Sequence, residues 1–453
     1  MAWWDSLKFT SDAKVINSDE LSLFRNSSFS RLWGSQILSQ IAQQLLNFAL
    51  IVRVFDLAQH SKFANISVAL VVLSFGIPSI FFAAAAGVFV DHWNKKTVLI
   101  TSNIIRGILV VGYLFVEKNL GLVLLLTFLI SSTTQFFAPA EAALMPELVG
   151  PKQLLRANSL FIFTLYGSFI VGYGLASPII ALYGPQSPYY ITSSMFLIAA
   201  LFVMGLPKSN AVEKARIKLS AVIKFTKDEL SDNFKLIKAE KNLSFPILEL
   251  TVSQAMVGVI LALAPAISVA LIHKPLQNAS QFLIVPAGVG MIIGVVAIGN
   301  LVKKHTKLTI ITLSMLAASI TLTLLGILGI VQYVLSNQSI PHVQMPLIVS
   351  LLIAGLILVL GFMNGVISIA SQTLIQENTT EETRGKVFGA LNMMVNIAAT
   401  LPILFASVLA DILGVTSVIV ILGLVMIIFS MIQLKTIKND PKYNKMRKLA
   451  KNT

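Results

Sequence analysis

The residues of this sequence that could take part in chemistry are amides and ionisable groups set inside long apolar segments. In segment 31–55, Gln36, Gln40, Gln43 and Asn47 are spaced three or four residues apart, so they share one face of a helix. An amide that loses its hydrogen bonds in apolar surroundings costs roughly 2–7 kcal/mol. We expect this face to line a cavity that binds a ligand reversibly. Hydrogen bonding between helices is the alternative.

Other apolar segments carry amides that are candidates for the same cavity. They are Gln135, Gln254, Asn364, Gln372, Asn392 and Asn396. The last two are four residues apart and share a helix face. Together with the first stripe they predict a substrate-binding wall, whose chemistry is hydrogen bonding and not bond cleavage.

The composition identifies the elements that must position these residues. The chain has 453 residues, of which 56% are hydrophobic and 12% charged, and its mean hydropathy is +0.82. Soluble proteins have roughly 25% charged residues, and a bilayer is crossed by segments of about 20 apolar residues. Twelve spans are predicted, at 31–55, 64–90, 97–116, 120–138, 157–183, 187–206, 246–272, 279–302, 307–332, 346–374, 385–410 and 414–434. The sequence therefore predicts an all-α membrane protein with twelve transmembrane helices.

A polar stretch divides these spans into two groups of six. We expect a cytoplasmic N-terminal segment, a six-helix bundle, a cytoplasmic amphipathic linker, a second six-helix bundle and a basic cytoplasmic tail. Their boundaries are 1–29, 30–206, 207–243, 244–434 and 435–453.

The basic residues predict the orientation. If the N-terminus is inside, 29 of the 34 Lys and Arg residues fall on the inner side, four fall outside, and Arg106 lies within a span. Cytoplasmic loops carry such an excess of positive charge. We therefore expect both termini in the cytoplasm and a multi-pass protein of the plasma membrane, in a bacterium the inner membrane. The same distribution indicates that the net charge of +14 serves orientation and not a nucleic-acid partner.

The turn after the second span contains a motif. Gly87 is followed by Asp91 and then by Lys95 and Lys96. This spacing resembles the signature of the major facilitator superfamily, with His92 in place of a basic residue and Asn94 in place of a glycine. Asn tolerates a left-handed backbone better than other non-glycine residues. A partial counterpart, Gly299-x-x-x-Lys303 with Lys304 and Lys307, follows the eighth span.

Three further stretches resemble the drug–proton antiporter branch that contains macrolide-efflux and siderophore-export proteins. They are residues 24–36, residues 138–149 with 156–158, and residues 384–389. The resemblance implies two pseudo-symmetric bundles with the substrate site between them. It also implies gating by Gly87, Asp91, Lys95, Lys96, Arg106 and Arg384, with Asp91 facing the start of the eleventh helix. Thr379 to Glu382 fits a capping box for that helix.

The ionisable residues inside the spans are the remaining candidates. Arg106 at mid-bilayer costs about 2.5–3.5 kcal/mol, so we expect Asp91 or Glu141 as its partner, in a structural ion pair or in gating. Glu141 and Glu249 are candidates for proton coupling, although Glu249 could instead simply begin its helix. Asp56 and Asp411, at the outer ends of spans, are expected to be solvated caps.

These features favour a secondary active transporter that exports an amphipathic small molecule (a drug, macrolide or siderophore) in exchange for protons. A lysophospholipid transporter with the same fold is the alternative, because residues 138–158 also resemble that group, and a non-transporting receptor or scaffold is a third.

A phosphate-binding loop is absent, so ATP is not the direct energy source, and we expect no enzymatic activity. With no cysteine and five scattered histidines we expect no cofactor and no metal site. Expected partners are the substrate, protons and membrane lipids, with the protein a monomer.

Overall fold

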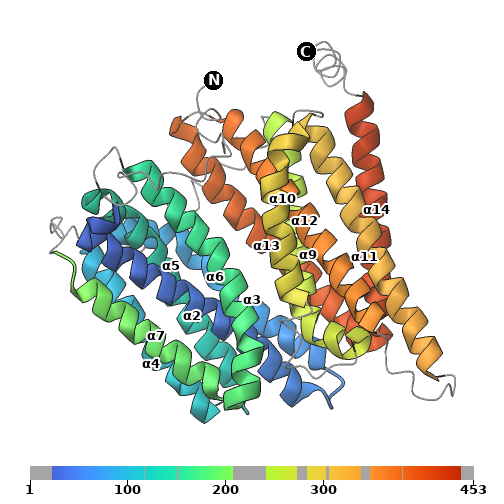
Figure 1. Ribbon diagram of the computed structural model, residues 1–453, viewed down its shortest axis with the longest axis horizontal. Coiled ribbons are helices and arrows are strands. Elements are labelled where there is room, and N and C mark those ends of the chain that lie inside the picture. The colour runs from blue at the N-terminus through green and yellow to red at the C-terminus, as the bar shows by residue number, and fades with distance from the viewer. Residues whose placement is uncertain are drawn as a thin grey trace.

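The computed structural model describes residues 23–116, 118–149, 153–207, 241–272, 283–302, 306–337, 347–379 and 381–439, which contain helices and no β-strand. The first bundle consists of α2 (Ser27–Ala58), α3 (Ala64–His92), α4 (Lys95–Val116), α5 (Leu120–Leu148), α6 (Leu154–Tyr183) and α7 (Ser187–Met204). The second consists of α9 (Lys241–Ile267) with the π-helical turn η2 (Ser268–Ile272), α10 (Val285–Val302), α11 (Lys307–Asn337), α12 (Leu347–Glu377), α13 (Glu381–Leu413) and α14 (Val415–Asn439). The two bundles lie side by side (Figure 1).

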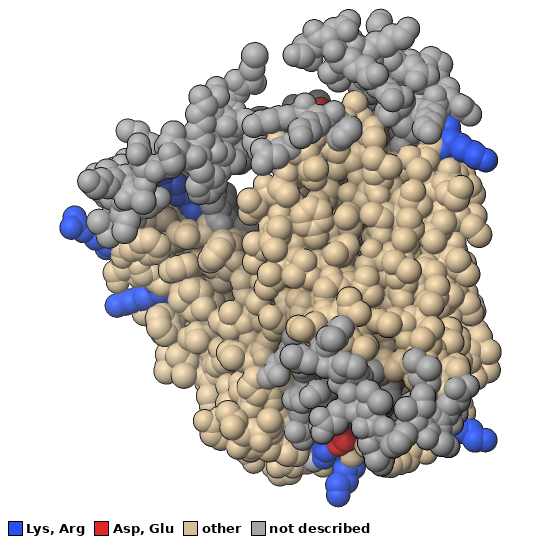
Figure 2. Space-filling view, turned by 45° about the vertical axis from the view of Figure 1, so that its right-hand side comes forward, with Lys and Arg blue, Asp and Glu red and all other residues tan. Residues whose placement is uncertain are grey.

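The helices have the length and composition of membrane spans. Ten of those described are long and apolar enough to cross a bilayer, and α10 and α13 contain shorter apolar stretches, Val285–Gly299 and Ile397–Leu413. On the face seen in Figure 2, the described Lys and Arg residues lie at the margins, toward the two ends and at the left edge, and the broad surface between them is uncharged. This belt matches the hydrocarbon layer of a bilayer. The predicted all-α membrane class is confirmed.

Several helices extend beyond the predicted spans. We predicted that the fourth span ends at residue 138, yet α5 continues through Pro139 and Pro146 to Leu148. Proline is tolerated in a membrane helix because neighbouring groups can satisfy the freed carbonyls.

The expected capping box is also wrong in one respect. The Thr379 hydroxyl donates to the carbonyl of Ile375 at the end of α12, 2.9 Å away, and α13 begins only at Glu381.

Paired glycines bring α10 and α12 into direct backbone contact. A Cβ atom on Gly290 would lie 2.0 Å from the Leu358 carbonyl oxygen, and one on Gly361 would lie 1.9 Å from that of Ala287. One helical turn further on, Gly294 and Gly365 make equivalent contacts, at 2.2 Å and 2.4 Å from carbonyl oxygens of the opposite helix. Each helix therefore contributes a Gly-x-x-x-Gly pair, the spacing that allows close helix packing in membranes.

Substitution at this seam should unfold the second bundle. A valine at Gly361 cannot fit without moving α10 away, so we expect Gly361→Val to lower the free energy of unfolding by about 3 kcal/mol or more. Thermal unfolding of detergent-solubilised protein would measure this loss. Gly355→Val is the matched control, because a Cβ atom there meets no heavy atom within 4 Å. Equal stability of the two variants would contradict the packing argument.

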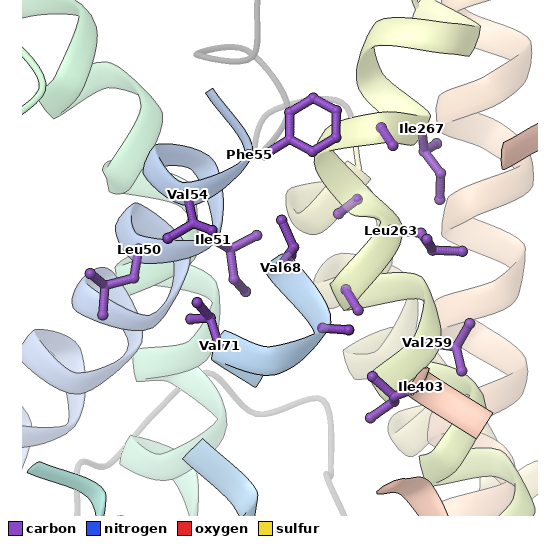
Figure 3. Packing of buried hydrophobic residues seen from close by; sticks show 14 of the residues in the cluster. Leu50, Ile51, Val54, Phe55, Val68, Val71, Val259, Leu263, Ile267 and Ile403 are labelled. Carbon is purple, nitrogen blue, oxygen red and sulfur yellow. The ribbon is translucent and has the colours of Figure 1, made fainter. Parts of the chain in front are cut away.

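The two bundles meet at one end of the molecule. A single cluster of buried side chains joins Ile51 of α2 and Val68 of α3 to Val259 of α9 and Ile403 of α13 (Figure 3). These residues lie toward the end at which α2, α9 and α13 finish and α3 begins, which we name the closed end. In the described part of the chain, each buried cluster toward the opposite end belongs to one bundle alone.

A second contact between the bundles joins α6 to α10. The side chain of Ile170 lies against Gly288, where a Cβ atom would come within 2.7 Å of it, and Val285 lies against Gly174 in the same way at 3.2 Å. These contacts place side chains on glycines, in contrast to the backbone contacts between α10 and α12. The bundles therefore touch along two seams, one formed by α2 and α3 against α9 and α13 and the other by α6 against α10.

Candidate functional site

Arg106 occupies the interior of the first bundle, halfway along α4. Its side chain is 2% exposed, and the guanidinium carbon lies 4.5 Å from the ring centroids of both Phe137 and Phe196. Nη2 donates to Asn103 Oδ1 at 2.6 Å, and that oxygen also accepts from the Ser39 hydroxyl at 2.9 Å. Aromatic faces attract a desolvated guanidinium. Arg106 is therefore held by α2, α4, α5 and α7 together.

Glu141 of α5 is the acidic group that interacts electrostatically with Arg106. Its side chain is buried, and its Oε1 atom has no hydrogen-bond partner. Of the two partners expected for Arg106, Glu141 is thus present in the same bundle. The side chain of Asp91, the other expected partner, lies outside the described residues.

Glu249 is a buried carboxylate of the second bundle. It is 0% exposed, and neither of its carboxylate oxygens has a hydrogen-bond partner. It lies in α9 next to Leu250, which packs with Ile375 of α12 and Leu391 of α13. Because α9 begins at Lys241, Glu249 lies about 12 Å into the helix at about 1.5 Å per residue, and it does not begin that helix.

The amide stripe of α2 is joined to neighbouring helices of its own bundle. Gln43 Nε2 donates to Asn47 Oδ1 at 2.8 Å, and the Thr134 hydroxyl of α5 donates to Gln43 Oε1 at 3.3 Å. Asn47 also bonds to Tyr173 of α6. Gln36 donates weakly to a carbonyl of α6, at 3.4 Å, and leaves its Oε1 unpartnered. Gln40 is half-buried.

The remaining amides do not all meet in one place. Gln135 donates to the Ser131 carbonyl of its own helix at 3.3 Å. Asn364 donates to Ser253 at 2.8 Å beside a cavity of about 50 Å³ inside the second bundle, large enough for water. Gln254 and Gln372 are half-buried. The side chains of Asn392 and Asn396, on α13, lie outside the described residues.

The basic residues of the signature fasten helix ends within the first bundle. Lys95 forms an ion pair with Glu147 of α5 at 2.9 Å, and Lys96 donates to the carbonyls of Met204 and Leu206 where α7 ends. A cation is favoured at a helix C-terminus, where the macrodipole is negative. Asn94 accepts from the Thr97 amide at 3.0 Å and so caps α4.

Two other residues of the expected gate belong to α3 and α13. The surroundings of Gly87 in α3 and the side chain of Arg384 in α13 lie outside what the structure describes. Their gating role therefore stays a prediction.

Sequence reasoning missed the role of Asp411. We expected a solvated cap, but its carboxylate hydrogen-bonds to Asn65 and Ile66 at the start of α3, in the other bundle. The correction follows from the seam at the closed end, which brings the end of α13 against the first turn of α3. The acidic residue at a helix end was visible in the sequence, but its partner is 346 positions away.

Comparison with known proteins then identifies the family. The family model described as Major Facilitator Superfamily matches residues 32–337 and 339–452. The chain belongs to the major facilitator superfamily. Within this family, YfiS of Bacillus subtilis (strain 168), an MFS-type transporter, is 24% identical over 421 residues, covering 92% of this chain and 94% of its own. Macrolide efflux protein A of Streptococcus pyogenes is 24% identical over 425 residues, covering 93% of this chain and 97% of its own.

Solved structures of the superfamily share the fold. The nucleoside transporter NupG superposes with a TM-score of 0.70 at 15% identity, covering 90% of this chain and 100% of its own. A POT family transporter in complex with 5-aminolevulinic acid gives a TM-score of 0.68 at 8% identity, covering 90% and 95%. This superfamily member is therefore a multi-pass membrane protein of the transporter family, with the fold that the resemblance implied.

Proposed function

We propose that this protein exports an amphipathic small molecule, such as a drug, macrolide or siderophore, by alternating access in exchange for protons. Membership of the major facilitator superfamily supports transport. The likeness to macrolide efflux protein A over nearly the whole chain supports export of an amphipathic compound. The protein would act in the plasma membrane, in a bacterium the inner membrane, with both termini in the cytoplasm.

The observation that supports proton coupling is the burial of Glu249 without hydrogen-bond partners. A buried carboxylate whose two oxygens lack partners is costly when charged. Ionisable residues inside membrane helices are rare and are retained chiefly for function. Glu249 is therefore suited to hold a proton in one conformation and to release it in another that admits water or a cation.

The first bundle supplies a second ionisable centre, formed by Arg106 and Glu141. Arg106 is held by aromatic rings and Asn103, so its guanidinium keeps its position while Glu141 gains or loses a proton. In this proposal Glu141 is the second coupling candidate. The amides of α2 and the second bundle would form the substrate wall when the bundles separate.

Gating is proposed at the end opposite the closed end. Gly87, Asp91 and Arg384 belong to the last turns of α3 and to the first turn of α13, which would meet there if the motif acts as in other members of the superfamily. Lys95 and Lys96 would hold the ends of α4, α5 and α7 in place during that movement. Arg106 would connect the gate to the bundle interior.

Flux into proteoliposomes tests the proposal. Purified protein would be reconstituted with and without an imposed pH gradient and offered a macrolide, a lysophospholipid or a nucleoside. Macrolide flux that requires the gradient supports the proposal. Lysophospholipid flux independent of the gradient would favour the lipid transporter, and no flux of any compound would favour the non-transporting receptor.

Gln40→Leu should change which compounds are exported. Gln40 is half-buried on the face of α2 that carries the other amides, and a leucine there removes both hydrogen-bonding groups at similar size. We expect export of amide-binding compounds to fall about fivefold, since one hydrogen bond contributes about 1 kcal/mol, while apolar compounds are unaffected. Efflux of a compound panel measures this. Gln59→Leu, at an exposed position, is the control, and a uniform decrease for all compounds would contradict the cavity assignment.

A further inference from the structure

The carboxylate of Asp411 binds the first turn of a helix in the opposite bundle. Oδ1 accepts from the Asn65 backbone amide at 3.0 Å and from Asn65 Nδ2 at 2.7 Å, and Oδ2 accepts from the Ile66 amide at 3.1 Å. Asp411 lies near the end of α13, and Asn65 is the second residue of α3. One side chain of the second bundle thus satisfies three donors of the first.

The two backbone donors have no alternative partner within their own helix. The first amides of any helix lack intrahelical acceptors, and the residue before α3, Phe63, makes no capping bond with its side chain. Asp411 therefore performs the task of an N-cap from the other bundle. Its negative charge is also favoured by the positive end of the α3 dipole.

The contact lies on the seam that closes this end of the molecule. Ala64 and Val68 of α3 pack in the same cluster as Ile403 and Ala410 of α13. Asp56, at the end of α2, differs because it is exposed and bonds within its own segment, to Arg53 at 3.4 Å and to Gln59 at 3.2 Å. Separation of α3 from α13 would break the Asp411 contacts but not those of Asp56.

We propose that Asp411 and the first turn of α3 form a latch that stabilises the conformation closed at this end. When this end opens, the hydrogen bonds between the three amide donors and the carboxylate must break and be replaced by hydrogen bonds to water. The latch therefore sets how often this end opens. Its role in transport rests on the proposed function, but its effect on the conformational equilibrium does not.

Accessibility of Val68 tests the latch directly. The chain has no cysteine, so Val68→Cys introduces a single thiol at a position that is 0% exposed within the seam. In nanodiscs, without substrate or gradient, the rate of maleimide labelling reports opening of the closed end. Adding Asp411→Asn removes the charge and one acceptor, so we expect labelling to become about 5- to 30-fold faster.

Matched controls separate the latch from general damage. Asp56→Asn should leave labelling of Val68→Cys unchanged, and labelling of Lys62→Cys, in the exposed turn before α3, should be the same with and without Asp411→Asn. An unchanged rate at position 68 in folded Asp411→Asn protein would overturn the proposal. Loss of transport together with an unchanged rate would also overturn it, whereas faster labelling without any transport would support the latch and count against the proposed function.

A second pair of variants tests the same contact from α3, and its single variant, Asn65→Asp, applies even if Asp411→Asn does not fold. Asn65→Asp places two carboxylates together and should open this end, and the double variant Asn65→Asp with Asp411→Asn restores one carboxylate and one amide across the seam. We expect the first to accelerate labelling and the second to return it toward the original rate. Failure of the double variant to slow labelling would show that the two side chains do not act on each other.

Discussion

Replacing Glu249 by glutamine is expected to abolish pH-driven transport while leaving substrate exchange intact. Glutamine has nearly the same shape but cannot bind or release a proton. Glu249 is fully buried without hydrogen-bond partners, so the substitution removes no observed contact. The folded protein should therefore remain stable, and only the link between proton and substrate movement should be lost.

The size of the effect follows from the gradient. If one proton moves per substrate, a gradient of one pH unit supports about tenfold accumulation, because one unit corresponds to about 1.4 kcal/mol. Glu249→Gln should reduce this accumulation to none, while exchange of labelled for unlabelled substrate continues. Uptake in proteoliposomes measures both quantities on the same preparation.

Glu377→Gln provides the matched control. Glu377 ends α12, is exposed and pairs with Lys307. Its substitution should leave accumulation unchanged. Gradient-driven accumulation by Glu249→Gln equal to that of the original protein would exclude Glu249 as the coupling group and leave Glu141 as the candidate.

Arg106→Ala should cause a large loss of stability. The substitution removes a fully buried guanidinium, leaves Phe137 and Phe196 facing a cavity and leaves Glu141 without its charged neighbour. Removing one partner of a buried charge pair costs about 3–5 kcal/mol. Thermal unfolding followed by tryptophan fluorescence would measure the change, and Arg25→Ala, at an exposed position, is the control.

A double variant tests the origin of this loss. If the stranded Glu141 carboxylate contributes to it, adding Glu141→Gln to Arg106→Ala should recover part of the stability. No recovery would assign the loss to packing alone. A stability of Arg106→Ala equal to that of Arg25→Ala would contradict the interior role of Arg106.

The sequence predicted those parts of the fold that depend on local composition. Apolar length located the helices, and the spacing of Gln43 and Asn47 placed them on one face. Their partners Thr134 and Tyr173 could not be predicted, because those residues belong to other helices. The extension of α5 beyond Pro139 was missed for a related reason, since proline ends a helix in water but is accommodated when neighbouring helices surround it.

The pairing of the glycines could not be predicted from local sequence either. The Gly-x-x-x-Gly spacing at Gly290 and at Gly361 is visible in the sequence, yet nothing local specifies that α10 pairs with α12. Asp411 likewise depends on a helix start far away in the chain. The arrangement of the candidate site depends on contacts between helices that are distant in the sequence, and a single sequence does not specify which helices meet.

Helix α10 carries glycines of two kinds, and this difference has a mechanical consequence. Gly290 and Gly294 fix the α10 backbone against α12, whereas Gly288 receives only the side chain of Ile170 from the other bundle. A side chain can slide over a glycine, but two interlocked backbones cannot separate without breaking the seam. Helices α10 and α12 must therefore move together as one rigid unit relative to α6, and Asn364 on α12 moves with them.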